Sequence, residues 1–372
     1  MRSYHALHYV DARDLAPLGS EEIDLVVTSP PYPMIEMWDG VFESLSSEID
    51  ADGHAPTAAA GTRGDSGPEA AFEGMHRILD GVWRECFRVL KPGAFLCINI
   101  GDATRTVGEQ FRLYTNHARI ISACEGMGFQ SLPPILWRKP TNAPNKFMGS
   151  GMLPAGAYVT LEHEHVLILR KGGRRVFSQE DRTRRQRSAF FWEERNVWFS
   201  DIWDLRGTPQ ALTNRETRER SGAFPFELAF RLICMYSLYE DHVLDPFLGT
   251  GTTTAAAIAA GRNSVGIEID HRFDATIRET VGHGAEAGAE RQRRRVRDHL
   301  DFARLRAESE KPLGYRNEPH GFPVMTRQEQ RLEIRVAGEP HIAEAPDGGT
   351  TVEVDHGLWE PTEPIQRGIF DA

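Results

Sequence analysis

The chain has 372 residues, a formal net charge of -11 and four cysteines. This length allows one large α/β domain with additions, or two domains. The cysteines form no CxxC pair, which argues against a disulfide framework or a zinc site and favours buried, reduced thiols. The N-terminus lacks the apolar stretch of a signal peptide, and no segment has the length of a membrane span. We therefore expect a cytoplasmic protein without membrane association.

The negative charge is concentrated in two segments. Residues 36–73 carry a net charge of about -8 and residues 333–371 about -7, which leaves about +4 for the rest of the chain. The most basic stretch begins at Arg170 and reaches Arg187. The acidic total therefore does not exclude a nucleic-acid partner.

The apolar patterns predict strands that alternate with helices. In chain order we expect a strand at 7–10, a strand at 25–27, a mobile insertion at about 44–70, a helix at 71–89 that ends at Lys91-Pro92-Gly93, a strand at 94–100, a helix at 111–127, strands at 135–137 and 164–169, a helix at 223–239, a strand at 242–244, a helix at 252–260, a strand at 264–269, a helix at 291–306 and a hairpin of 330–336 with 350–354. This alternation predicts an α/β fold with a doubly wound, mainly parallel sheet.

The first chemical motif is Ser29-Pro30-Pro31-Tyr32, which directly follows the strand-like run of residues 24–28. The paired prolines restrict the backbone, so that the direction of the Pro30 carbonyl is fixed before a substrate arrives. The motif lies at the carboxyl end of a buried strand, where an open α/β sheet binds its ligands.

The second motif covers residues 245–253, Asp-Pro-Phe-Leu-Gly-Thr-Gly-Thr-Thr. Gly249 and Gly251 allow the backbone at a strand-to-helix turn to approach a nucleotide-like ligand closely. The turn has neither the lysine of a P-loop nor the third glycine of a dinucleotide fingerprint. Glu268 ends the next strand, where a doubly wound fold positions an acid for a ribose diol.

Together the two motifs resemble those of the DNA amino-methyltransferases that use S-adenosylmethionine, in the β-group order of catalytic motif before cofactor motif. The resemblance extends over about residues 4–274. It implies a seven-stranded, Rossmann-like methyltransferase sheet, S-adenosyl-L-methionine as cofactor and double-stranded DNA as substrate. The target base must leave the duplex, because its amine is inaccessible inside it.

The resemblance also implies roles for individual residues. Ser29 and the carbonyl of Pro30 would hold the target amine, next to Pro31, and the Tyr32 ring would stack on the base. The residues implied to bind the cofactor are Asp11, Phe224, Asp245, Phe247, Gly249, Thr250, Gly251, Thr252 and Glu268. Asp245 would accept a hydrogen bond from the methionine amino group.

Three functions are compatible with these motifs. Serine at position 29 resembles the cytosine-N4 branch, so the first hypothesis is a cytosine-N4 methyltransferase. The second is an adenine-N6 methyltransferase, and the third is a catalytically inactive nucleic-acid-binding subunit, against which the two intact motifs argue. A homodimer and a cognate restriction endonuclease are the further partners that this class of enzyme suggests.

We expect a catalytic half at 1–170, a target-recognition region at 171–220, a cofactor half at 221–280 and a C-terminal extension at 281–372. Arginines of the recognition region can neutralise DNA phosphates, and the candidates are Arg174, Arg175, Arg182, Arg184, Arg185 and Arg187. The basic stretch 291–297 is the alternative DNA surface. We expect Trp198 and Trp203 in a core, and no metal site, because His163 and His165 share one strand face without an evident third ligand.

Overall fold

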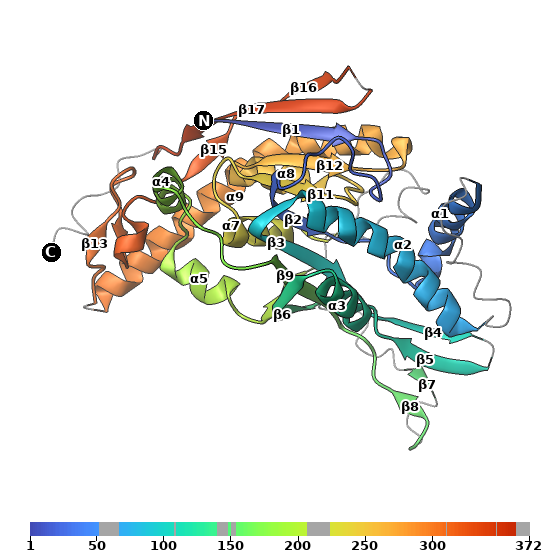
Figure 1. Cartoon of the computed structure of the whole chain (residues 1–372). Coiled ribbons are helices and arrows are strands. Elements are labelled where there is room, and N and C mark those ends of the chain that lie inside the picture. Colours follow the sequence, from blue (N-terminus) through green and yellow to red (C-terminus); the bar gives the residue numbers. More distant parts are fainter. Residues whose placement is uncertain are drawn as a thin grey trace.

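A large mixed sheet runs through the molecule (Figure 1). The structure, a computed structural model, describes residues 1–51, 67–107, 109–139, 148–149, 154–206, 224–309, 311–346 and 348–361. In spatial order the strands are β10 (Ile202–Asp204), β6 (Phe129–Arg138), β9 (His163–Lys171), β3 (Leu90–Ile100), β2 (Ile23–Thr28), β11 (His242–Asp245), β12 (Asn263–Ile267), β1 (Arg2–His8), β17 (Thr350–Leu358) and β15 (Arg335–Ala337), and β16 (His341–Glu344) also pairs with β17.

The stretch from β6 to β1 is the predicted seven-stranded core, and four further strands extend it at its two edges. Strands β3, β2, β11, β12 and β1 are parallel, whereas β9 runs antiparallel between β6 and β3. The chain winds outward from β2 to β3 and in the opposite direction from β11 to β12. Open α/β sheets bind ligands at such a switch, outside the carboxyl ends of the strands.

Helices cover both faces of the sheet, because successive strand residues point to opposite faces. Val26 of β2 packs with α2 (Pro68–Val89) and α3 (Asn116–Gly126) on one face. Its neighbours Leu25 and Val27 pack with α7 (Phe226–Tyr236) and α8 (Thr252–Ala260) on the other. The predicted α/β fold with a doubly wound, largely parallel sheet is confirmed.

The long helix α9 (Asp274–Glu308) lies unusually close to α8. A Cβ atom added at Gly284 would stand 2.8 Å from the Ala255 Cβ, and one added at Gly288 would stand 2.6 Å from the Ala259 Cβ. Both distances are shorter than real Cβ contacts, so glycine is needed at these two positions for this approach. Helix α8, which begins within the cofactor motif, is therefore packed directly against α9.

Two predicted boundaries before β6 are wrong. The helix expected at 111–127 begins at Asn116, because residues 103–114 form the hairpin of β4 (Ala103–Val107) and β5 (Gln110–Tyr114). The helix before Lys91-Pro92-Gly93 ends at Val89, as predicted, but these three residues belong to β3, which begins at Leu90 and not at residue 94. Gly93 adopts a φ of +83°, where an added Cβ would overlap the backbone of Arg175.

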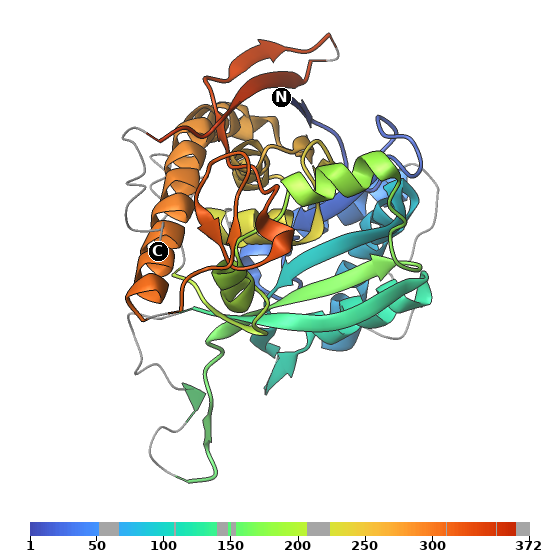
Figure 2. The same cartoon turned by 90° about the vertical axis from the view of Figure 1, so that its left-hand side faces the viewer.

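The insertion expected at 44–70 is helical in its first part, because α1 spans Asp39–Ala51, and α2 begins at Pro68. Residues 52–66 lie outside the described residues. A second hairpin, β7 (Met148–Gly149) with β8 (Ala157–Tyr158), projects from the body near β4 and β5 (Figures 1 and 2). The rings of Phe111 and Tyr158 lie 5.2 Å apart and connect the two hairpins.

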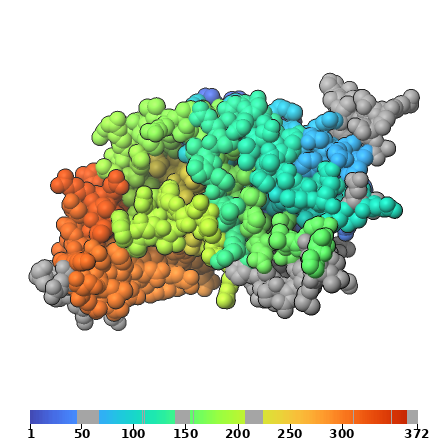
Figure 3. Space-filling view, turned by 90° about the horizontal axis from the view of Figure 1, so that it is seen from below, coloured from blue at the N-terminus to red at the C-terminus, as the bar shows by residue number. Residues whose placement is uncertain are grey.

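The expected C-terminal extension is part of the main body. The boundary placed at residue 280 falls inside α9, which is continuous. The expected hairpin forms in another register: β15 pairs with residues 356–358 of β17, whereas residues 350–355 pair with β1. Figure 3 shows α9 in orange beside the yellow-green segment that contains α5 (Trp192–Trp198), and Figure 2 shows β16 and β17 beyond the N-terminus.

The remaining elements are short. They are η1 (Glu36–Trp38), α4 (Gln179–Arg187), η2 (His271–Phe273), β13 (Tyr315–Arg316), β14 (Pro323–Val324) and η3 (Arg327–Glu329). Within the described ranges, no helix combines the length and apolar character needed to cross a membrane. All four cysteines are buried and free, as expected.

Candidate active site

A cavity of about 860 Å³ opens at the carboxyl ends of β2, β11 and β12. It collects both sequence motifs in one place. The predicted site residues that line it are Asp11, Ser29, Pro30, Pro31, Tyr32, Phe224, Asp245, Phe247, Gly249, Thr250, Thr252 and Glu268. Gly251 lies in the same turn but does not line the cavity.

The second motif forms a tight turn between β11 and α8. Gly249 and Gly251 have φ values of +54° and +88°, a left-handed conformation that favours glycine. Gly251 is the N-cap residue of α8, so the positive end of the helix faces the turn. The turn therefore provides the close backbone approach that the sequence predicts.

Asp245 connects this turn to the first motif. Its Oδ1 accepts hydrogen bonds from Thr28 Oγ1 (2.6 Å) and from the amide of Phe247 (3.0 Å), and its Oδ2 accepts one from Thr253 Oγ1 (2.5 Å). Burial raises the pKa of Asp245 to about 6, although these hydrogen bonds lower it. The carboxylate is thus an organising group of the cavity floor with lone pairs left for a ligand donor.

Glu268 lies at the end of β12, opposite the turn. Its carboxylate accepts hydrogen bonds from the amide of Gly249 (2.9 Å) and the amide of Asp270 (2.9 Å). Burial raises the pKa of Glu268 to about 7, and the charges of Asp270 and Asp245 act in the same direction. A carboxylate of this kind is suited to accept hydrogen bonds from two hydroxyl groups.

Apolar and acidic side chains complete this part of the wall. Phe224 is 5% exposed, and the Phe247 ring packs edge-on against Trp83. Asp11 is held by Arg13, whose Nε donates to it at 2.8 Å. Aromatic walls, a glycine turn and three acids (Asp11, Asp245 and Glu268) fit a nucleoside with an amino-acid tail.

The first motif forms a directed hydrogen-bond chain. Ser29 Oγ donates to the Tyr32 hydroxyl (3.1 Å), which donates to Glu164 Oε2 (2.9 Å). Lys139 forms an ion pair with the other Glu164 oxygen, and Asn99 Nδ2 donates to the Tyr32 hydroxyl at 2.8 Å. The chain leaves the lone pairs of Ser29 Oγ free to accept a hydrogen bond from an incoming amine.

The Tyr32 ring is partly buried and packs closely against Gly101. Burial, together with the Glu164 carboxylate, raises the pKa of Tyr32 well above its usual value, so the phenol stays protonated. A Cβ added at Gly101 would lie 3.0 Å from the ring. Met34, which follows the motif, is buried with a φ of +64°, the kind of backbone strain that concentrates at functional sites.

Sequence reasoning missed three members of this network: Asn99, Lys139 and Glu164. No spacing rule connects them, because Glu164 follows Tyr32 by 132 residues. They meet because β9 inserts between β3 and β6, and an antiparallel strand within a mainly parallel sheet was not predicted. Only the pairing of these strands reveals the contact.

The predicted DNA-contacting arginines lie elsewhere. Arg175 pairs with Asp241 (2.6 Å), and Asp241 precedes β11, at the edge opposite the cavity. Arg184 pairs with Asp181 (2.6 Å).

Arg187 pairs with Glu333 (2.9 Å), and the exposed Arg185 lies over the Phe177 ring. Arg174 and Arg182 are exposed as well. A DNA role for the six arginines stays a prediction, and for Arg175, Arg184 and Arg187 the ion pairs argue against it.

The aromatic residues of the same region are mostly core, as expected. Trp198 and Trp203 are each 2% exposed and pack with α7 and α8. Residues 207–223 lie outside the described residues. On α9, Arg291 pairs with Glu227 and Arg295 is buried against Glu194, so two arginines of the alternative DNA surface have structural partners.

A Rossmann-like sheet with a ligand cavity at its switch point, a buried acid at the end of β12 and a serine-proline-proline-tyrosine loop is the architecture of an enzyme that binds a nucleotide-like cofactor. The chain belongs to the DNA methylase family N6_N4_Mtase, whose family model matches residues 23–279. It is 48% identical over 336 residues to the Type II methyltransferase M.MthZI of Methanothermobacter thermautotrophicus, covering 90% of this chain and 91% of that protein.

It is also 47% identical over 279 residues to the Type II methyltransferase M.MjaI of Methanocaldococcus jannaschii, covering 75% of this chain and 91% of that protein. Among solved structures, it is similar to a proposed DNA modification methylase from Thermus thermophilus complexed with S-adenosyl-L-methionine. That similarity has a TM-score of 0.55 at 34% identity and covers 75% of this chain and 95% of that chain.

Proposed function

We propose that this DNA methyltransferase transfers the methyl group of S-adenosyl-L-methionine to the exocyclic N4 amine of a cytosine flipped out of double-stranded DNA. The observation that carries this proposal is the hydrogen-bond chain that begins at Ser29, an uncharged acceptor at the position where adenine-N6 members more often carry an acid. The family membership supports the coarser statement, a DNA methyltransferase that depends on S-adenosyl-L-methionine.

The cavity residues divide between the two ligands. When bound, the cofactor supplies an electrophilic methyl group. The ribose diol would be held by Glu268, the methionine amino group by Asp245, and the adenosine between Phe224, Phe247 and Asp11. The glycine turn allows the chain to approach the cofactor without a side chain in between.

The amine is held by uncharged acceptors. Its lone pair is delocalised into the base, so nitrogen must become more tetrahedral as it attacks. Ser29 Oγ and the Pro30 carbonyl would each accept one amine hydrogen, which directs the remaining lone pair toward the methyl group. The proton on nitrogen can leave after transfer, so the site needs no general base, and the high pKa of Tyr32 makes it a poor one.

Glu164 sets the direction of the hydrogen bonds that run from Ser29 through Tyr32. Because its carboxylate accepts a hydrogen bond from the Tyr32 hydroxyl, the Tyr32 oxygen accepts one from Ser29, and Ser29 has no donor left to oppose the amine. The other oxygen of this carboxylate forms an ion pair with Lys139. Glu164 and Lys139 are therefore positioning residues in this proposal.

The test is to incubate DNA with the protein and labelled S-adenosyl-L-methionine, digest it to nucleosides and analyse these by mass spectrometry. Label in N4-methyldeoxycytidine supports the proposal. Label in N6-methyldeoxyadenosine overturns the choice of base and leaves the class of reaction intact. No label with any DNA would favour the inactive DNA-binding subunit. A homodimer and a cognate restriction endonuclease stay predictions.

A further inference from the structure

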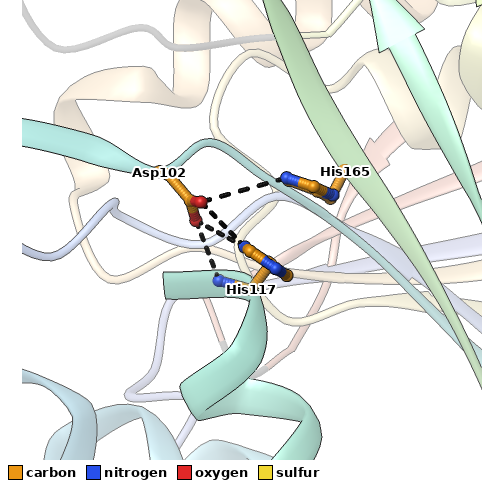
Figure 4. Close-up of side chains that lie close together, drawn as sticks. All are labelled: Asp102, His117 and His165. Atoms are coloured by element: carbon orange, nitrogen blue, oxygen red, sulfur yellow. Dashed lines mark hydrogen bonds and ion pairs between the residues drawn. The ribbon is translucent and has the colours of Figure 1, made fainter. Parts of the chain in front are cut away.

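Three side chains that commonly bind metal ions meet beside the cavity without lining it (Figure 4). Asp102 follows the carboxyl end of β3, His117 lies in the first turn of α3, and His165 lies near the start of β9. One ligand atom from each lies within 4.8 Å of the other two. In the sequence, only the closely spaced His163 and His165 suggest a metal site. The fold brings Asp102 and His117 next to His165.

The distances fit a small divalent ion. His117 Nδ1 lies 2.8 Å from each Asp102 oxygen, and His165 Nε2 lies 3.9 Å from Asp102 Oδ2. Tetrahedral bonds of about 2.0–2.2 Å to zinc place ligand atoms about 3.3–3.6 Å apart. The two distances to Asp102 lie on either side of this value. The His117 and His165 rings are stacked 3.9 Å apart, so they must turn toward a common point to bind the ion.

The donor set indicates the kind of ion. Two imidazoles and one carboxylate suit zinc, iron, nickel or copper better than calcium or magnesium. The His117 side chain is 27% exposed, so water can reach the site and complete the coordination shell.

We propose that Asp102, His117 and His165 bind a divalent transition-metal ion of the zinc class. The ion has a structural role. Asp102 and His117 flank the β4–β5 hairpin, and His165 follows Glu164 of the hydrogen-bond chain. A metal ion at this site would connect the base of the β4–β5 hairpin to β9, the strand that carries Glu164.

The neighbouring loop contains a further connection to the catalytic motif. Asn116 Nδ2 donates to the carbonyls of Pro33 (3.0 Å) and Gly101 (2.9 Å). Metal-bound His117 and Asp102 lie next to Asn116 and Gly101 in the chain. The ion would therefore stabilise the wall against which the Tyr32 ring packs, without touching either ligand of methyl transfer.

The test uses the full chain without a purification tag, stripped with a chelator and dialysed. Titration with Co²⁺, followed by its visible absorption, and with Zn²⁺ in competition with a chromophoric chelator, should show one saturable site. Asp102→Asn and His165→Gln should each weaken binding by about tenfold or more, since loss even of an outer-shell partner costs about tenfold to a hundredfold. Zn²⁺ should raise the Tm of the wild type but not of either variant.

The matched control is His163→Gln. This exposed imidazole lies on the same strand, 5.0 Å from the His165 ring, but outside the group. Its replacement should leave binding unchanged. Absence of a saturable site in the wild type, or equal weakening by His163→Gln and His165→Gln, would overturn the proposal. If Asp102→Asn fails to fold, His165→Gln decides, since His165 makes no hydrogen bond to Asp102 at 3.9 Å.

Discussion

Thr28 and Asp245 join the two halves of the active site through one buried hydrogen bond of 2.6 Å, although they lie 217 residues apart in the sequence. Thr28 is the last residue before the Ser29 motif, and Asp245 is the first residue of the cofactor motif. The bond fixes the carboxyl end of β2 against that of β11. In the proposed function, this pair of side chains sets the position of the amine site relative to the cofactor site.

Thr28→Val should destabilise the protein by about 1–3 kcal/mol, because it removes a donor from a buried carboxylate. Thr254→Val is the matched control, since Thr254 is equally buried and its hydroxyl has no hydrogen-bond partner among the described residues. Urea unfolding of both variants measures the difference. Equal free energies of unfolding would show that the Thr28 bond contributes nothing.

The sequence predicts the core strands and both motifs because each is a local pattern: an apolar run followed by a turn with special residues. It does not predict β9 as an antiparallel strand, since an apolar run does not encode its direction. Glu164 and Lys139 were missed for that reason. Residues 111–114 of β5 were taken as helix because Phe111 and Leu113 continue the apolar residues of α3.

Ser29→Ala and Glu164→Gln should each lower kcat strongly while the affinity for S-adenosylhomocysteine stays near that of the wild type. The first removes an amine acceptor, and loss of one such pre-organised group costs about 10²–10³-fold in kcat. The second removes the charge that orients the chain. Single-turnover methylation and calorimetric titration give the two quantities, and Glu162→Gln, an exposed position just before β9, is the control.

Gly249→Val should abolish binding of S-adenosylhomocysteine, because the valine side chain would occupy the space in which the cofactor contacts the backbone of the turn. Gly348→Val is its control: Gly348 also has a positive φ, +81°, with open space around it, and lies far along the chain in the β16–β17 turn. Both variants should lose about 1–2 kcal/mol of stability from left-handed strain. Retained affinity in a folded Gly249→Val protein would contradict the placement of the cofactor.

Affinity for S-adenosylhomocysteine should increase from pH 6 to pH 8 by up to about tenfold, because ionised Glu268 accepts the ribose hydroxyls better and its pKa is raised to about 7. In the protein without ligand, pH affects the free energy of unfolding in the opposite direction. Because the folded-state pKa of Glu268 is raised, its contribution to stability is present below about pH 4.5 and is lost as the pH rises through 7. Calorimetry across this range is the measurement.

Glu268→Gln should remove most of this pH dependence and weaken binding at pH 8. Asp245, whose pKa is raised to about 6, accounts for the part that stays. A Glu268→Gln protein with the full pH dependence of the wild type would assign the titration to another group.

Replacement of Arg138 and Arg272 by Ala should reduce the salt dependence of DNA binding more than replacement of Arg182 and Arg185. Both residues of the first pair are 61% exposed at the cavity side of the sheet, and their surface ion pairs with Asp204 and Asp270 are weak enough to be exchanged for phosphate contacts. The second pair lies on α4 at the opposite edge. Each lost phosphate contact lowers the log-log salt slope by about 0.9. A larger change in the second pair would support the recognition region predicted from the sequence.

The pairing of β1 with β17 places Met1 beside His356, with the amino group 3.4 Å from the His356 carbonyl. The first and last strands of the chain, β1 and β17, are thus neighbours in the sheet, and a short peptide can connect them. A circular permutant opened between α5 and α7 would then present the glycine turn first and Ser29 second. The order of the two motifs along the chain is therefore a property of connectivity, which a permutant can reverse while the spatial arrangement of the cavity is preserved.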